Sequence, residues 1–185
     1  MTTIHGTANY DAAGNFSFVP DSAVPPPLPP TVGWVYHNGV FLWPGDYNFS
    51  CHANYADTTG GSLALSRKDI AITLTGPWGG WLPYAPGTPP AFDSTPYTKL
   101  TFALKPTVAI QKWHVYFVAL GDKPVGISIN PANYGPVPQA GVWATYTVPL
   151  ADLGVLGTSI YKFAIQDQTG LTANTWYVDA VGFVA

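Results

Sequence analysis

Two tryptophans separated by two glycines form the part of the sequence best suited to hold a ligand. Trp78 and Trp81 are large, flat and apolar, and Gly79-Gly80 between them adds no side chain that would shield the indoles. Indoles displayed in this way can stack on the apolar face of a ligand. Tryptophan is also a common core residue, so either ring alone fits a packing role equally well. The spacing predicts a stacking platform, with burial of one or both rings as the alternative.

Residues suited to catalysis form no recognisable constellation. The four histidines share no metal-ligand spacing, and neither Gly-x-Ser-x-Gly nor His-Glu-x-x-His occurs. Cys51 and His52 are adjacent, but neighbouring residues of a strand face opposite sides, which argues against a thiol–imidazole pair. The 10 acidic residues are all aspartates. The sequence leaves open a role for two of them as glycosidase acid and base, because the distance between two side chains depends on the three-dimensional structure. We expect no enzymatic activity.

Composition and charge narrow the class of protein. A chain of 185 residues suits one main domain with a sizeable core. Aromatic residues at 15%, charged residues at 9%, 19 glycines and 19 prolines are typical of many short strands joined by turns. The net charge of -3, with seven scattered Lys and Arg residues, predicts neither nucleic acid nor a membrane as partner. No run of about 18 apolar residues and no signal peptide is evident.

The segments that must position the aromatic residues have the sequence patterns of strands. Residues 69–75 alternate with the period of a half-buried strand and run directly into the tryptophan segment. Two short strands flank the Asn38-Gly39 turn within 33–47, a strong hairpin signal. Further strand patterns cover 63–65, 99–104, 113–120, 125–129, 143–148, 160–166 and 175–184. Strands at this spacing, with no helical period, predict an all-β antiparallel β-sandwich.

Three segments differ in character along the chain. Residues 1–19 predict an N-terminal β-hairpin arm, with strands at 4–10 and 15–19. Residues 20–31 form a proline-rich linker that favours extended polyproline II. The β-sandwich is expected over 32–185, and the first 30 residues are expected to be dispensable for its folding.

Several motifs follow one another in an order that carries a family resemblance. They are Ile-Thr-Leu-Thr-Gly with Trp-Gly-Gly (72–80), Phe-Asp-Ser-Thr-Pro-Tyr leading into a strand (92–102), Gly-Val-Trp with Pro-Leu-Ala-Asp-Leu-Gly (141–154), and the closing pair of strands (165–170 and 175–183). This order resembles the carbohydrate-binding β-sandwich modules appended to bacterial cellulases and related glycan-active enzymes. The resemblance implies a jelly-roll, galactose-binding-domain-like fold that binds polysaccharide without cutting it.

Glycan binding needs flat apolar faces for sugar C–H groups and fixed polar groups for hydroxyls. Trp43 lies at a strand end, before Pro44-Gly45, and fits either the rim of a site or the core. The aspartates fit either a ligand or a turn that bonds its own backbone. The expected carbohydrate-binding residues are Trp78, Trp81, Trp43, Tyr47, Tyr84, Asp46, Gln166 and Asp167.

The sequence therefore favours non-catalytic binding of polysaccharide, such as a β-glucan or cellulose. The alternative is a structural or adhesion domain of a larger assembly such as a phage virion or tail protein. Either function suits an extracellular or virion-associated location. No cofactor is expected, because no cluster of metal ligands is evident. The single cysteine, Cys51, excludes an intrachain disulfide and a cysteine zinc site. A structural Ca²⁺ is the alternative, given the many aspartates. The identity of the glycan stays open.

Overall fold

The computed structural model describes residues 6–10, 16–20, 32–37, 39–60, 68–118 and 124–185. The chain divides into two compact units, Met1–Thr31 and Val32–Ala185. In the first unit, β1 (Gly6–Tyr10) pairs antiparallel with β2 (Phe16–Pro20), so the predicted hairpin is present in these ranges. The proline-rich residues 21–31 lie outside the described ranges, and the roles of arm and linker stay predictions.

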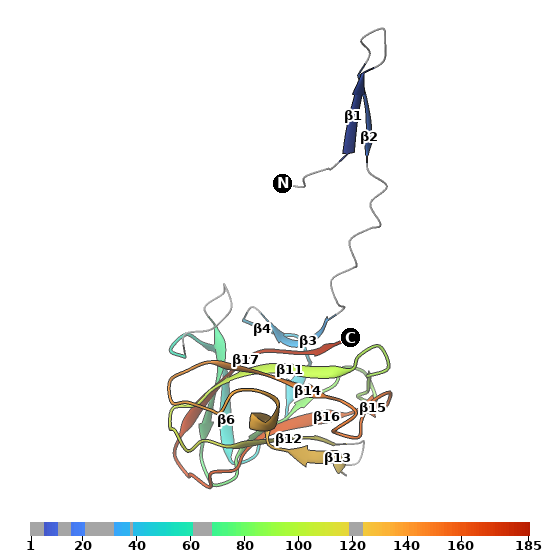
Figure 1. Cartoon of the computed structure of the whole chain (residues 1–185). Helices are drawn as coiled ribbons and strands as arrows, with labels where there is room; N and C mark the ends of the chain where they lie inside the picture. The colour runs from blue at the N-terminus through green and yellow to red at the C-terminus, as the bar shows by residue number, and fades with distance from the viewer. Residues whose placement is uncertain (1–5, 11–15, 21–31, 38, 61–67, 119–123) are drawn as a thin grey trace. The chain divides into compact units, whose positions relative to one another are not determined.

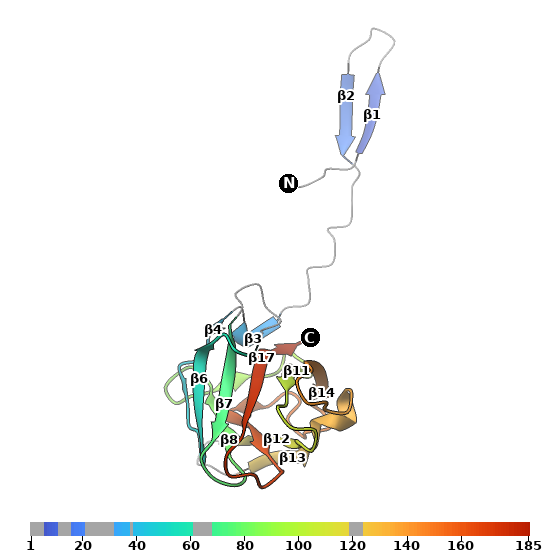
Figure 2. The same cartoon turned by 90° about the vertical axis from the view of Figure 1, so that its left-hand side faces the viewer.

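The second unit contains a seven-stranded antiparallel sheet. Its strands are β3 (Val32–His37), β4 (Val40–Phe41), β6 (Cys51–Asp57), β7 (Asp69–Leu74), β11 (Lys99–Lys105), β14 (Ala144–Pro149) and β17 (Thr175–Val184). The order is β14-β11-β17-β3-β4, and β7 also pairs with β17 and with β6. Figure 2 shows β6, β7 and β17 running side by side.

A six-stranded sheet lies against the first. Its strands are β5 (Gly45–Asp46), β8 (Gly80–Trp81), β9 (Pro83–Tyr84), β12 (Trp113–Val118), β13 (Pro124–Ile129) and β16 (Lys162–Asp167). The order is β13-β12-β16-β9-β5, with β8 also on β16. Figure 1 shows β17, β11 and β14 in one layer above β16, β12 and β13 in the other. The predicted antiparallel β-sandwich is confirmed.

Short elements complete the second unit. They are the paired strands β10 (Phe92–Asp93) and β15 (Ser159–Ile160), and the 3₁₀ helix η1 (Pro131–Tyr134). In the described ranges no helix has the length and apolar character needed to cross a membrane.

Aromatic side chains from both sheets fill the space between the layers. Phe163 of β16 and Phe183 of β17 meet edge to face, with ring centroids 6.1 Å apart. Trp43 stacks on Phe183 at 6.0 Å and presents its edge to Phe163 at 5.7 Å. All three rings are buried. Contacts of this kind add to the large apolar area that aromatic side chains remove from water, so they hold the two sheets together.

Most of the predicted strands are present, but three details differ. β6 was not predicted as a strand, because its polar and small residues carry a weak apolar alternation. The predicted strand at 63–65 lies outside the described residues. β7 is more buried than a half-buried strand, with Ala71 covered as well as Ile70 and Ile72. The reason is that β7 lies between β6 and β17.

A buried carboxyl group lies at the start of β7. The side chain of Asp69 is fully buried, and its carboxyl group lies close to that of Asp57. Burial is the main cause that raises its pKa to about 7, and the carboxylates of Asp57 on β6 and Asp179 on β17 act in the same direction. Lys105 on β11 acts against them. Tyr36 of β3, whose pKa is also raised, faces the same carboxylates. Asp69 therefore holds a proton in the folded state at pH values where the unfolded chain has lost it.

This proton makes the stability of the domain depend on pH. Because the folded-state pKa of Asp69 is raised, its contribution to stability is present below about pH 4 and is lost as the pH rises towards 7. We expect the melting temperature of the wild type to fall between pH 5 and pH 8, relative to Asp69→Asn, by at least the roughly 2–4 °C that correspond to 1 kcal/mol. Thermal melts of both proteins across this range test it, and parallel curves would contradict it.

The second unit has its own core and its own pair of sheets, which predicts that it folds without the first. A variant lacking residues 1–31 should be soluble and should melt within about 2–4 °C of the full chain, the equivalent of roughly 1 kcal/mol. Near-ultraviolet circular dichroism and thermal melts measure this. An insoluble or unfolded product would show that the hairpin is needed, for example to cover an edge strand.

Candidate functional site

The alternation along β16 determines which side chains lie on the outer face of the six-stranded sheet. Phe163 and Ile165 are buried in the core, so Lys162, Ala164 and Gln166 point to the other side of the sheet. Residues that pair directly across antiparallel strands share a face. The register thus brings Tyr84 and His114 to this outer face, since they pair with Lys162 and Gln166 respectively.

Three tyrosines and a lysine form a hollow at the start of β16. The hollow has a volume of about 250 Å³ and is lined by Tyr47, Tyr84, Tyr161 and Lys162. Tyr47 is 68% exposed, whereas Lys162 is only 6% exposed. The ring of Tyr84 lies over Gly45, where an added Cβ would come within 2.3 Å of the Tyr84 hydroxyl. Glycine at position 45 therefore allows Tyr84 to lie close to the sheet.

Trp78 lies at the opposite end of β16. Its indole is 50% exposed and its backbone has φ 62°, a left-handed conformation that is uncommon for a residue with a side chain. The Gln166 Nε2 donates a hydrogen bond of 2.9 Å to the Trp78 carbonyl oxygen. The indole borders Gly170, where an added Cβ would lie 3.4 Å from the ring. Trp78 is therefore held in place while about half of its surface stays open. Backbone strain of this kind is often found at ligand-binding positions.

The middle of the face carries side chains that the sequence analysis did not select. Tyr116 on β12 pairs with Ala164. Burial raises the pKa of the Tyr116 hydroxyl, which keeps its proton at neutral pH. The His114 Nδ1 and the Ser128 Oγ are 3.0 Å apart, and burial lowers the pKa of His114, so its ring is neutral at pH 7. The pattern Trp113–Val118 alternates inward and outward, which could have identified Tyr116 and His114.

Two of the predicted tryptophans are core residues, so their prediction as exposed stacking groups is wrong. Trp81 is fully buried, and its Nε1 donates to the Tyr55 hydroxyl at 2.8 Å. It pairs with Ile165, which points inward, and alternation therefore directs its indole into the sandwich. Trp43 is 5% exposed and packs on Phe163 and Phe183, which resolves its two possible roles in favour of the core.

The two predicted aspartates also serve the fold. Asp46 lies on the face opposite to Gly45, and its carboxylate accepts hydrogen bonds from Asn48 and from the Tyr55 hydroxyl. Asp167 is fully buried and accepts hydrogen bonds from Gln111 and Thr169. Both carboxylates are occupied inside the protein. Of the eight predicted residues, Tyr47, Tyr84 and Gln166 lie on the outer face, and Trp78 lies at its edge, where its backbone carbonyl is bonded to Gln166.

The remaining chemical candidates do not form a reactive centre. Cys51 is buried, its pKa is raised to about 11 mainly by burial, and its thiol donates to the Gly80 carbonyl oxygen at 3.2 Å. The neighbouring His52 is exposed, as expected for adjacent residues of a strand. Among the residues that the structure describes, no three His, Cys or Asp side chains are grouped closely enough to hold a metal ion.

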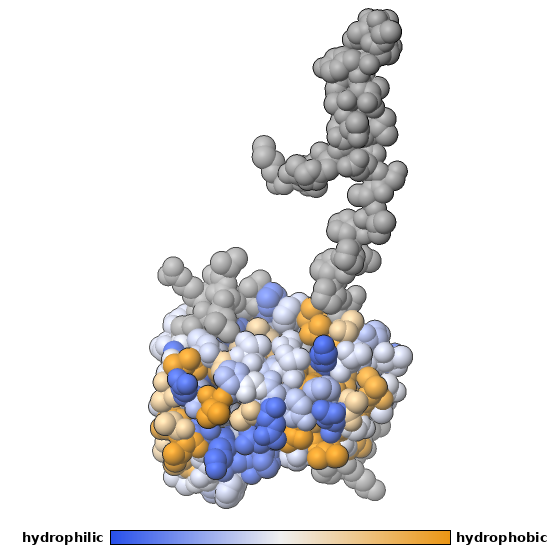
Figure 3. All heavy atoms as spheres, viewed as in Figure 1, coloured by the Kyte–Doolittle hydropathy of each residue, from blue (hydrophilic) through white to orange (hydrophobic). Residues whose placement is uncertain are grey.

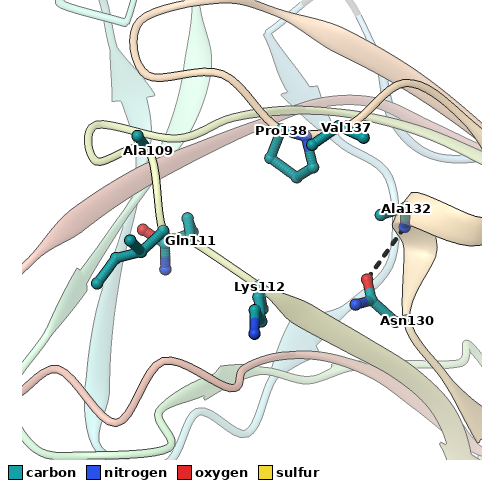
Figure 4. A pocket seen from close by; sticks show the side chains of 8 residues that line it. Ala109, Gln111, Lys112, Asn130, Ala132, Val137 and Pro138 are labelled. Carbon is teal, nitrogen blue, oxygen red and sulfur yellow. Dashed lines mark hydrogen bonds between the residues drawn. The ribbon is translucent and has the colours of Figure 1, made fainter.

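A second hollow, of about 230 Å³, lies between the start of β12 and the segment after η1. Figure 4 shows Gln111 and Lys112 on one side of it, with Asn130, Val137 and Pro138 on the other. The Asn130 Oδ1 accepts a hydrogen bond from the Ala132 amide at 3.1 Å, and Gln111 is bonded to Asp167. These two polar side chains of the hollow thus stabilise the loops around it.

Figure 3 shows apolar patches separated by polar ones on the side of the molecule viewed there.

Comparison with solved structures identifies the fold. No protein-family model and no curated protein matches the sequence. The family 11 carbohydrate-binding module of the cellulosomal cellulase Lic26A-Cel5E of Clostridium thermocellum aligns with a TM-score of 0.53, at 14% identity, over 84% of this chain and 95% of the module. CBM29_1, a family 29 carbohydrate-binding module from Piromyces equi, aligns with a TM-score of 0.54, at 10% identity, over 83% of this chain and 89% of the module. The chain has the fold of these carbohydrate-binding modules.

The same sandwich also occurs as a part of larger proteins. The enzymatically active domain of tailspike protein 4 of bacteriophage CBA120 aligns with a TM-score of 0.50 at 10% identity. The alignment covers 76% of this chain but 19% of the tailspike chain. The family resemblance expected from the sequence is confirmed for the fold, and the ligand has to be argued from the outer face itself.

The different positions of the two tryptophans predict different effects of the same substitution. Trp81→Ala should lower the free energy of unfolding by about 3–5 kcal/mol, because it leaves a cavity in the core. Trp78→Ala should change it by less than about 1 kcal/mol, since half of that indole is already in contact with solvent. Urea denaturation measures both values. Equal losses for the two variants would contradict the assignment of Trp78 to the surface.

Proposed function

We propose that residues 32–185 form a non-catalytic polysaccharide-binding module that holds its ligand across the outer face of the six-stranded sheet. The observation that carries this proposal is the arrangement of aromatic side chains at both ends of β16. Tyr47 and Tyr84 line the hollow at its first residue, and near its end Gln166 is bonded to the backbone carbonyl of Trp78, whose half-exposed indole borders Gly170. Aromatic faces of this kind are suited to stack on sugar rings. The fold shared with carbohydrate-binding modules supports the same proposal.

The spacing of these groups favours a chain of sugars over a single sugar. Lys162 and Gln166 are four residues apart on β16, which corresponds to about 13 Å along a strand. Tyr116, His114 and Ser128 lie on the same face and supply hydroxyl and ring-nitrogen groups for hydrogen bonds to sugar hydroxyls. A β-linked glucan or another plant or microbial glycan is the ligand class that we propose. With such a ligand, the location of the protein would be extracellular or virion-associated.

The charges of the face support binding without hydrolysis. Glycoside hydrolysis usually requires two carboxyl groups on either side of the scissile bond. Within the described strands of the six-stranded sheet, the two carboxylates are those of Asp46 and Asp167, and each is bonded inside the protein. The outer face of these strands therefore offers no acid and base pair to a bound glycan.

Binding should depend on the exposed aromatic side chains at both ends of β16. We expect the wild type to be retained on at least one of insoluble cellulose, xylan or mannan. Tyr47→Ala and Trp78→Ala should each weaken that binding by about tenfold, equivalent to about 1.4 kcal/mol, because each variant removes a stacking surface. Depletion isotherms, with thermal melts of the same variants, measure binding and stability together.

Val40→Ala is the matched control, because it removes an exposed apolar side chain from β4 in the other sheet. Its binding should equal that of the wild type. Unchanged binding in both aromatic variants would contradict the assigned face. No retention of the wild type on any polysaccharide would instead favour a structural or adhesion domain.

A further inference from the structure

The hollow beside η1 has apolar walls that stay open to solvent. Ile110 and Val137 both line it, and their side chains are 64% and 74% exposed. Ala109, Ala132 and Pro138 complete the apolar part of the wall. The volume of about 230 Å³ leaves room for a group larger than a single water molecule. A ligand that placed a methyl group in this hollow would remove apolar surface of both partners from water.

A hydrogen-bond donor points into this hollow from Asn130. The Asn130 Oδ1 accepts from the Ala132 amide at 3.1 Å, and this bond fixes the orientation of the side-chain amide. The Nδ2, which has two hydrogens to donate, therefore lies on the side of the hollow, as Figure 4 shows. Gln111 is different, because its Nε2 donates to Asp167 and its Oε1 accepts from Asn174. Asn130 is thus well placed to bind an acceptor oxygen of a ligand in the hollow.

The hollow adjoins the outer face of the six-stranded sheet. Val115 on β12 pairs with Ile129 on β13, and both side chains pack against the core. His114 and Asn130 come next in this register, and the backbone of Asn130 is extended, with φ -75° and ψ 120°. Alternation therefore places both residues on the outer side of the sheet. A glycan on the outer face can thus reach the hollow with a substituent of the sugar that contacts His114.

We propose that the hollow beside η1 binds an acetyl group carried by the glycan, so that acetylated polysaccharides are the preferred ligands. The methyl of the acetyl group packs against Ala132, Val137 and Pro138, and its carbonyl oxygen accepts a hydrogen bond from the Asn130 Nδ2. The inference rests on the proposed function, because it concerns a substituent of the same glycan. An O-acetyl ester and an N-acetyl amide both fit, since each presents a methyl group beside a carbonyl oxygen.

The side chains of the hollow favour an acetyl group over a hydroxyl, a carboxylate or a methyl ether. A hydroxyl would accept from Asn130 but would leave the apolar wall in contact with water. A carboxylate would lie against apolar side chains, and Lys112 at the hollow is exposed, so water screens its charge. A methyl ether would cover the wall but would offer Asn130 a weaker acceptor than a carbonyl oxygen. The acetyl group supplies the apolar contact and the acceptor together.

The test uses pairs of glycans that differ in the acetyl group. The probes are O-acetylated glucomannan with its alkali-deacetylated form, and chitohexaose with cellohexaose, in which a hydroxyl replaces each acetamido group. We expect the wild-type full chain to bind the acetylated member of at least one pair about fivefold more tightly, the effect of one buried methyl group and one hydrogen bond together. Isothermal titration calorimetry measures the ratio of affinities, and the pair that shows it identifies an ester or an amide.

Two variants assign this preference to the hollow. Asn130→Asp keeps an oxygen that accepts from the Ala132 amide but replaces the donor with a second acceptor, so the preference should fall below about twofold. Ala132→Leu extends a larger side chain into the hollow and should also reduce the preference below about twofold. It keeps the test decisive if Asn130→Asp does not fold, and thermal melts show which variants are folded.

Asn133→Asp is the matched control, because it makes the same chemical change on an exposed residue of η1 that does not line the hollow. This variant should keep the preference of the wild type for the acetylated member.

The outcomes separate this inference from the proposed function. Equal affinity of the wild type for both members of both pairs would overturn the inference and leave the proposed function intact. A preference that persists in a folded Asn130→Asp or Ala132→Leu variant, or that is lost in Asn133→Asp, would also overturn it. Absence of binding to all the glycans, with or without acetyl groups, would overturn the proposed function and this inference with it.

Discussion

The edge-to-face contact between Phe163 and Phe183 is the interaction on which the rest of the structure depends. It joins the central strand of one sheet to the central strand of the other, and the ring centroids are 6.1 Å apart. Trp43, Trp81 and Phe117 pack around Phe163, so its inward direction is fixed. In a strand, a shift of one residue would move every side chain to the opposite face. Because Phe163 must point inward, Lys162, Ala164 and Gln166 must point outward, and the candidate site follows from this constraint.

Buried polar groups support the same face from behind. Trp81 donates to Tyr55, and Tyr55 is bonded to Asp46 of the edge strand β5, directly before Tyr47. At the other end, Asp167 accepts from Gln111, and its own amide donates to the Gly79 carbonyl oxygen at 2.8 Å, next to Trp78. Buried polar groups that are hydrogen-bonded rigidify their surroundings. The aspartates thus position the aromatic side chains on the face and do not contact a ligand themselves.

The sequence allowed the fold to be predicted to a large extent, because strand alternation and turn residues are local properties. The strands at 99–104, 125–129 and 175–184 are present, and β3 pairs with β4, as expected of a hairpin in this part of the chain. The site was predicted only in part. Residue type suggested Trp78 and Tyr47, but the same reasoning suggested Trp81, whose direction depends on its pairing with Ile165 across the sheet. Lys162 was missed because two of the tyrosines around it, Tyr47 and Tyr84, come from segments far from it in the sequence. Alternation along 162–167 could have shown its outward direction, but not its contacts.

The most direct test of the central claim is to locate a bound glycan on the protein by nuclear magnetic resonance. Cellohexaose, xylohexaose and mannohexaose are titrated into the ¹⁵N-labelled chain, and the shifts of backbone amides and indole N–H groups are followed. We expect shifts in β16, β12 and β9 and in the indole of Trp78, with those of Trp113 and Trp176 in the core unchanged. Shifts confined to the seven-stranded sheet or to the hollow beside η1, or no shifts with any of the three sugars, would contradict the outer face of the six-stranded sheet as the binding site.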